Sequence, residues 1–159
     1  NHDLRRGKQM QAEELWNHFI EEYPRYKHHT YEAWQYGVVP DELAELTRQG
    51  VKTATTSGYD LYEADQEPLP LEGGFNVILD RQDNAICITQ ITKVYVVPFQ
   101  DVSERHAFKE GEGDRTLGYW RSVHTDFFSE AYQEAGLPFS EESQVVCEEF
   151  EMVFPGAEQ

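Results

Sequence analysis

Two short segments of the sequence contain side chains that could break and form bonds. The first, residues 50–55, places Lys52 and Thr55 three residues apart, and the second, residues 110–114, is an acidic, glycine-rich loop that starts at Glu110. A hydroxyl, an amine and a carboxylate are the groups that nucleophilic and acid–base catalysis use. Taken alone, the same residues are equally typical of a surface lysine, a hydroxyl on a strand face and a solvated acidic turn.

The spacing of Lys52 and Thr55 sets a geometric condition. In a regular strand, residues three apart point to opposite faces, so the two converge only if the segment turns or the lysine reaches round. Lys52 also follows the end of a predicted helix in an acidic protein, and both features favour the charged ammonium. Only desolvation by surrounding aromatic side chains would favour a neutral amine. Lys52 is therefore either a transiently neutral base or a charged clamp for a carbonyl or phosphate.

The charge balance restricts the partners of the chain. It has 13 Lys and Arg against 30 Asp and Glu, a formal net charge of −17. Duplex nucleic acid is bound mainly through cations that displace counterions from phosphates, so we expect no duplex partner. A short single strand or a single nucleoside is compatible with this charge, because a local cationic pocket can exist in an acidic protein.

Length and hydropathy predict one domain without a membrane span. The 159 residues, 39% of them hydrophobic, suit a single core. No stretch approaches the roughly 18 consecutive apolar residues that a membrane helix needs. The polar start of the sequence lacks the apolar region of a signal peptide, so we expect a cytoplasmic protein.

The cysteines and histidines lack the spacing of metal ligands. Cys87 and Cys147 lie in separate apolar segments without a CxxC motif, which predicts two buried thiols in a reducing compartment. His106 and His124 are isolated on separate predicted helices. We therefore predict no metal site and no cofactor.

Hydrophobic periodicity predicts the order of helices and strands. Helices are expected over residues 9–23, 40–49, 101–110 and 115–135, and strands over residues 75–80, 85–99 and 144–154. Residues 59–74 are predicted to form a loop, and Phe108 is expected to face inward. The alternation in the second strand slips around Ile91, which predicts a bulge or bend there. The pattern is that of an α+β fold, a small, mostly antiparallel β-barrel with flanking helices.

Residues 50–55, Gly-Val-Lys-Thr-Ala-Thr, resemble the Gly-x-Lys-x-x-Thr signature of the ASCH domain family. Further segments resemble one bacterial branch of that family in the same order: Trp34 with Gly37, Glu67-Pro68-Leu69-Pro70, Val97-Pro98-Phe99, residues 110–121 and Val145-Val146-Cys147-Glu148. The resemblance covers roughly residues 34–154. It implies an ASCH domain over residues 31–159, with residues 1–30 as a helical extension packed on the same domain.

The resemblance implies a PUA-like β-barrel with a cleft and a role near RNA. Members of the family have been linked to RNA binding, to cleavage of single-stranded RNA and to hydrolysis of the acetyl amide of N4-acetylcytidine. The residues that those amidohydrolases use match Lys52, Thr55 and Glu110. The family signature often has an arginine two residues after the threonine, where this chain has Ser57. Arg115 or Arg121 could supply the missing cation.

Aromatic residues and arginines complete the expected site. Trp34 and Tyr36 belong to an aromatic stretch, residues 25–37, that either packs a helix onto the barrel or lines a base-stacking pocket. The expected substrate-binding residues are Arg115, Arg121, Trp34, Tyr36 and Ser57.

Three hypotheses for function follow. The first is an enzyme that hydrolyses a small modified nucleoside of the N4-acetylcytidine type. The second is a single-stranded RNA binder or ribonuclease, for which Arg25, Tyr26 and Lys27 are the nearest approach to a cationic, aromatic groove. The third is an interaction module that has lost its chemistry, which the serine at position 57 would fit.

Overall fold

The structure is a computed structural model of the chain, and it describes residues 10–156. Within these residues the helices are α2 (Ala12–Glu22), η1 (Pro24–Tyr26), α3 (Pro40–Arg48), α4 (Tyr59–Ala64), η2 (Phe99–Asp101), α5 (Glu104–Glu110) and α6 (Leu117–Glu134). The strands are β1 (Tyr31–Gln35), β2 (Ala54–Gly58), β3 (Phe75–Leu79), β4 (Ala85–Pro98) and β5 (Gln144–Pro155).

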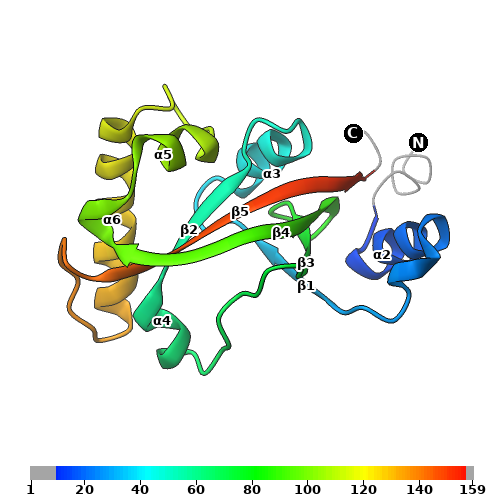
Figure 1. Cartoon of the computed structure of the whole chain (residues 1–159), viewed down its shortest axis with the longest axis horizontal. Helices are drawn as coiled ribbons and strands as arrows, with labels where there is room; N and C mark the ends of the chain where they lie inside the picture. The colour runs from blue at the N-terminus through cyan, green and yellow to red at the C-terminus, as the bar shows by residue number, and fades with distance from the viewer. Residues whose placement is uncertain (1–9, 157–159) are drawn as a thin grey trace. The chain divides into compact units, whose positions relative to one another are not determined.

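The strands form one five-stranded sheet in the order β1-β3-β4-β5-β2. Strand β1 pairs with β3 in parallel, whereas β3 pairs with β4 and β2 pairs with β5 in antiparallel fashion. The longest strands, β4 and β5, are neighbours in this order (Figure 1). The fold is therefore α+β, with a mostly antiparallel, curled sheet and flanking helices, as the sequence predicted.

Backbone contacts divide the chain into two compact units, each with its own packing. Among the described residues, unit 1 comprises residues 10–51, 73–91 and 150–156. In unit 1 the apolar face of α2 buries Leu15, Trp16 and Phe19 against residues of β3. A second cluster in unit 1 packs the buried side of α3 against residues of β3 and β4.

Unit 2 comprises residues 52–72 and 92–149 and contains the predicted catalytic residues. Its core packs Trp120, Phe128 and Tyr132 of α6 against Val145 and Cys147 of β5 and against residues after β4. Helix α5 contacts β2. At the end of β2 the backbone approaches α6 so closely that a Cβ on Gly58 would lie 2.6 Å from Tyr132 Cε1. Only glycine fits there without a shift of the tyrosine ring.

The structure differs from the sequence prediction in four places. Residues 59–74, predicted as a loop, begin with helix α4, and residues 31–35 of the aromatic stretch form strand β1. A register shift between β3 and β4 lies at Ile78 and Leu79, where none was predicted, and the bulge or bend predicted around Ile91 stays a prediction. Phe108 is 54% exposed instead of inward, because the buried positions of α5 are occupied by His106, Ala107 and Glu110.

The division into an extension over residues 1–30 and a domain over residues 31–159 stays a prediction. Residues 1–9 lie outside the described part of the chain. Across residues 10–156, no helix has the combination of length and apolar character that crossing a bilayer requires.

Candidate functional site

Lys52 and Glu110 form a buried ion pair in unit 2. Each side chain is 1% exposed, and Lys52 Nζ lies 3.0 Å from Glu110 Oε1. The same ammonium donates to Glu112 Oε2 at 2.9 Å and to the carbonyl oxygen of Ala54 at 2.9 Å. Two residues 58 positions apart in the sequence therefore meet, as the predicted catalytic set required.

The second carboxylate oxygen of Glu110 accepts three hydrogen bonds. Glu110 Oε2 accepts from Thr56 Oγ1 at 2.5 Å, from Trp120 Nε1 at 2.7 Å and from His106 Nε2 at 3.2 Å. Burial alone would raise the pKa of Glu110, but the charge of Lys52 and the bond from His106 hold that pKa well below its usual range. Glu110 is therefore a stably ionised carboxylate.

His106 lies on α5 one helical turn before Glu110. Its Nε2 is 2.7 Å from Thr56 Oγ1, and since that hydroxyl donates to Glu110, the imidazole is the donor to Thr56. Burial opposes the charged form of His106, but its bonds to Cys147 and Glu110 prevail and raise its pKa to about 9. His106 is thus an imidazolium near neutral pH.

The Lys52 cluster, which we define as Lys52, Thr56, His106, Glu110, Glu112, Trp120 and His124, has one side that is less buried. The side chain of Glu112 is 19% exposed, and His124 Nε2 lies 3.7 Å from Glu110 Oε1. One ligand atom from each of Glu110, Glu112 and His124 lies within 4.8 Å of the other two, close enough to hold a metal ion. Lys52 Nζ contacts both of these carboxylates, so its ammonium supplies the positive charge that a metal would bring.

Regular local structure positions the members of this cluster. In β2, alternation sends Thr56 toward the cluster together with the buried Ala54 and Gly58. In α5 and α6, a spacing of four residues puts His106 beside Glu110 and Trp120 beside His124. These i, i+4 pairs, and the period of two in β2, are the sequence signals that could have revealed the residues missing from the predicted set.

Thr55 does not join Glu110, because alternation in β2 places it on the other face of the strand. On that face it lies directly opposite Glu148 of β5 in the antiparallel register. Ser57 follows two residues later on the same face, and its Oγ is 2.6 Å from the hydroxyl oxygen of Tyr62 on α4. The predicted catalytic residues are thus divided between two faces of β2.

The two arginines expected to replace the missing cation contact protein groups. Arg115 Nε donates to the carbonyl oxygen of Phe108 at 3.0 Å, and its guanidinium carbon lies 3.7 Å from the centre of the Phe108 ring. Arg121 donates to the carbonyl oxygens of Phe99, Gln100 and Val102 at 3.0–3.2 Å, which fixes the turn η2 to α6. The role of both arginines as substrate ligands stays a prediction.

Trp34 and Tyr36 both lie in unit 1. Trp34 Nε1 donates to Asn76 Oδ1 at 2.8 Å, and the buried Tyr36 has its hydroxyl 2.8 Å from Thr47 Oγ1. Their rings meet edge to face with centroids 5.0 Å apart. These contacts match the packing interpretation of the aromatic stretch, and their predicted binding role is untested.

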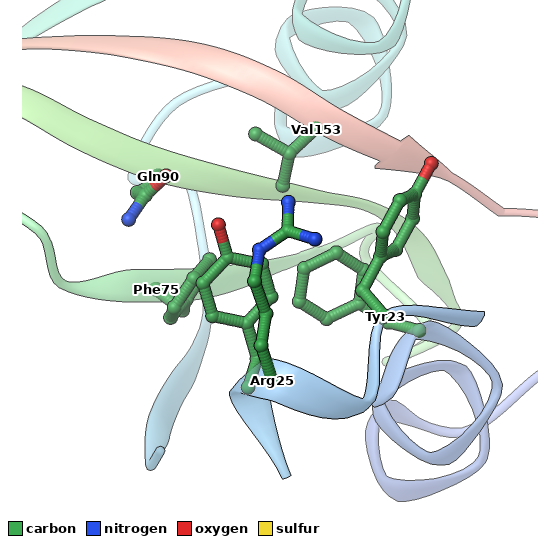
Figure 2. A pocket seen from close by; sticks show the side chains of 7 residues that line it. Tyr23, Arg25, Phe75, Gln90 and Val153 are labelled. Atoms are coloured by element: carbon green, nitrogen blue, oxygen red, sulfur yellow. The ribbon is translucent and has the colours of Figure 1, made fainter. Parts of the chain in front are cut away.

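Each unit also contains a small cavity. In unit 1 a cavity of about 210 Å³ is lined by aromatic rings with Arg25 and Gln90, and Figure 2 shows Arg25 extending between Tyr23 on one side and Phe75 on the other. The Arg25 guanidinium carbon lies 4.7 Å from the ring centre of Tyr26 and 5.5 Å from that of Tyr23. In unit 2 a cavity of about 200 Å³ lies over α4 and the following segment, lined by Tyr59, Asp60, Tyr62, Glu63, Glu67 and Leu69.

Comparisons with known proteins agree with this architecture. The model of the ASCH domain family matches residues 32–154. The crystal structure of an ASCH domain from Lactobacillus crispatus JV V101 is similar with a TM-score of 0.83 and 29% identity, over 88% of this chain and 92% of that one. A crystal structure of a protein from Enterococcus faecalis V583 has the same TM-score with 33% identity, over 91% of this chain and 88% of that one.

More distant structures share the fold alone. A mutant of the ASCH protein from Zymomonas mobilis has a TM-score of 0.52 with 11% identity, over 79% of this chain and 70% of that one. No curated protein matches the sequence.

Proposed function

Because this chain belongs to the ASCH domain family, a PUA-like fold family linked to RNA interaction, we propose that it acts on an RNA-derived modified nucleoside and hydrolyses the amide of N4-acetylcytidine. The observation that carries the proposal is the ion pair between Lys52 and Glu110, two of the three residues that match the amidohydrolases of the family. An acidic chain with a net charge of −17 also favours a small, weakly charged substrate over a nucleic acid polymer.

In this proposal Lys52 acts as a charged clamp. Its ammonium has two carboxylate oxygens and one carbonyl oxygen at 2.9–3.0 Å, a set of acceptors that favours the protonated amine. A substrate would enter at the less buried side, where Glu112 would give up its bond to Lys52 and the acyl carbonyl oxygen would accept it. An ammonium aimed at that oxygen stabilises the negative charge that develops there during attack on the amide.

The hydroxyl that attacks the acyl carbon is either Thr55 or Thr56. The hydroxyl would form an ester with the acetyl group, the N4 amine would leave with a proton, and water would hydrolyse the ester. Thr56 has the hydrogen-bonding environment of a nucleophile, between the imidazole of His106 and the carboxylate of Glu110. Thr55 has the match to the family and lies opposite Glu148.

The test is hydrolysis of N4-acetylcytidine by the purified chain, with acetate release and cytidine formation measured together. We expect Lys52→Ala to lower kcat at least about a hundredfold, the scale of a lost charge-stabilising or acid–base group. Lys52→Arg keeps the charge but cannot act as a base, so retained activity supports the clamp and lost activity supports the base. Thr55→Val and Thr56→Val, measured side by side, identify the nucleophile.

Inactivity of the folded wild-type chain toward N4-acetylcytidine would refute the hydrolase. Lys109→Gln is the matched control for a lost cation, because Lys109 pairs with Glu149 at 2.9 Å and belongs neither to the Lys52 cluster nor to the expected substrate-binding residues. A drop in activity with Lys109→Gln equal to that of Lys52→Ala would trace the effect to folding. Circular dichroism of each variant separates the two outcomes.

A second candidate function, binding of single-stranded RNA, is favoured by the cavity around Arg25. Proteins bind single strands by stacking bases on aromatic rings beside a cation. The cavity offers both features, in its aromatic rings and in the guanidinium group of Arg25 (Figure 2). If it operates, Arg25→Ala and Tyr26→Ala should each weaken binding of a labelled RNA oligomer about tenfold or more. Arg48→Ala, which removes a cation that pairs with Glu45 on α3 and does not line the cavity, is the control. Equal binding by the wild type and the three variants would show that the cavity does not bind RNA.

A further inference from the structure

Glu148 is a buried carboxyl group that the Lys52 cluster does not use. It lies on β5 directly opposite Thr55, so the two side chains share one face of the β2–β5 ladder. Side chains opposite each other in such a ladder have Cβ atoms about 4.5–5.5 Å apart. Ser57 lies two residues along β2 on the same face, next to the hydroxyl group of Tyr62.

The carboxyl group of Glu148 is isolated within the protein. The residue is 7% exposed, yet within residues 10–156 no hydrogen bond or ion pair to its carboxyl group is found. Burial, with the negative charge of Glu110 added, raises its pKa to about 7. Within residues 10–156 the only side-chain atom that is fully enclosed without a partner is the hydroxyl oxygen of Tyr132, so the carboxyl group of Glu148 keeps some contact with solvent and is accessible to a ligand.

Tyr62 connects this face of the ladder with a cavity. Tyr62, whose hydroxyl contacts Ser57, also lines the 200 Å³ cavity, and the charge of Glu148 contributes to a raised pKa of Tyr62 after the larger effect of burial. The lining also includes Glu67 and Leu69 of the Glu-Pro-Leu-Pro segment. The volume lies below the roughly 300–1,000 Å³ of drug-sized sites, so it suits one ring system.

We propose that Thr55, Ser57, Tyr62 and Glu148 form a nucleobase-binding site on the face of β2 away from the Lys52 cluster, and that the carboxyl group of Glu148 hydrogen-bonds the base. Tyr59 and Tyr62, which both line the cavity, supply a surface for stacking. The protonated carboxyl group of Glu148 offers one hydrogen-bond donor and one acceptor side by side. Such a pair matches the edge of a base that carries adjacent donor and acceptor atoms. The ligand class rests on the proposed function, whereas the site rests on the isolated carboxyl and the cavity.

The acidic side chains around the cavity favour an uncharged ligand over an anionic one. Asp60, Glu63 and Glu67 line it, and they would repel a phosphate group at close range. We therefore infer a free nucleoside, rather than a nucleotide or a strand, as the ligand. Cytidine should bind more tightly than cytidine 5′-monophosphate.

The experiment is calorimetric titration of the full chain with cytidine, N4-acetylcytidine and cytidine 5′-monophosphate. Glu148→Ala should weaken nucleoside binding about tenfold, the effect of one or two lost hydrogen bonds. Glu148→Gln keeps a donor and an acceptor and should bind within about threefold of the wild type. Glu149→Gln is the matched control, because Glu149 is the next carboxylate along β5 and pairs with Lys109.

The pH dependence adds a second readout. Two ionisable groups interact electrostatically with Glu148. The charge of Glu110 on α5 raises the pKa of Glu148, and the charge of Glu148 in turn raises the pKa of Tyr62 on α4. Wild-type affinity should fall as pH rises from about 6 to about 8, because the ionised carboxylate loses its donor. The Gln variant should lose this dependence.

Three results would overturn the site: no binding of either nucleoside to the wild type at millimolar concentration, unchanged binding by Glu148→Ala, or an equal loss in Glu149→Gln. These outcomes are separate from failure of the hydrolase. If the wild type binds nucleosides but releases no acetate, the site stands and the activity fails. If Glu148→Ala binds and hydrolyses as the wild type does, the activity stands and the site fails.

Discussion

Thr55 and Thr56 are adjacent in β2, yet only the Thr56 hydroxyl reaches the Glu110 carboxylate, at 2.5 Å. Thr55 lies opposite Glu148 on the other face of the ladder. One strand therefore presents hydroxyl groups to two carboxyl groups with opposite properties, since the pKa of Glu110 is held low and that of Glu148 is raised.

Replacing Thr56 with valine should destabilise the fold. Valine keeps the shape of threonine, but Glu110 loses a donor and His106 loses an acceptor. Hydrogen bonds to buried charged groups contribute about 1.5–3 kcal/mol, and we expect a loss of that size in the free energy of unfolding by urea. Thr55→Val, the control one residue away, should change stability by less than about 0.5 kcal/mol. Equal losses would show that the two hydroxyls are not distinguished by their surroundings.

The two carboxylates on Lys52 should differ in their effect on stability. Glu110→Gln removes the fully buried partner and should cost about 3–5 kcal/mol, because Lys52 and His106 then lack their principal countercharge. Glu112→Gln leaves that pair intact and should cost about 1 kcal/mol or less. Urea unfolding at neutral pH measures the loss of stability in each variant. A larger loss for Glu112→Gln would contradict the ranking by burial.

Stability should fall as pH rises from about 4.5 to about 9. The folded pKa of Glu148, about 7, lies above its ordinary value of 4.5. The contribution of Glu148 to the free energy of unfolding is therefore complete below about pH 4.5 and is lost as pH rises through 7. His106, with a folded pKa of about 9 against an ordinary 6.5, extends the decline to about pH 9. Glu148→Gln should therefore exceed the wild type in stability by about 2–3 kcal/mol at pH 8 and match it near pH 4.5. Thermal unfolding at both pH values tests this, and a wild type that is the more stable protein at pH 8 would contradict it.

Removing Lys52 should open a metal site. Lys52→Met leaves two carboxylates and an imidazole with ligand atoms within 4.8 Å of one another, a set that suits Zn²⁺ or Mn²⁺. We expect either ion to raise the melting temperature of Lys52→Met and to leave the wild type unchanged. The double variant Lys52→Met with Glu112→Gln should lose the response. An equal rise in the wild type would mean that the ammonium does not exclude a cation.

Much of the fold was accessible from the sequence, because long apolar periodicities dominate it. Helix α2 and strands β3, β4 and β5 follow from such patterns, and the structure has them within a few residues of the predicted ends. Strand β1 and helix α4 are short and lie beside turn-forming or aromatic residues, so local composition concealed them. Phe108 was assigned inward by its type alone, although the helical phase set by His106 and Glu110 turns it outward.

The site was only partly accessible. Resemblance to the family identified Lys52 and Glu110, which meet in the structure, but it placed Thr55 with them when alternation directs Thr56 there. His106 and His124 lie on predicted helices, but neither has the spacing of a metal ligand, and the predicted site therefore omits both. Their actual partners are a carboxylate and a backbone carbonyl from their own helices, Glu110 and Trp120. A search for i, i+4 pairs of polar residues on apolar helix faces would have found them.

The sequence distance between Lys52 and Glu110 has a consequence for folding kinetics. Their ion pair closes a segment of 58 residues, and closing so long a loop costs entropy before any contact within it forms. The pair should therefore form after the barrier, once α5 has docked on β2. Substitutions that weaken it would then speed unfolding and leave the folding rate nearly unchanged. The Lys52 cluster therefore resists transient opening through a slow unfolding rate, because its contacts are present in the native state and absent from the folding transition state.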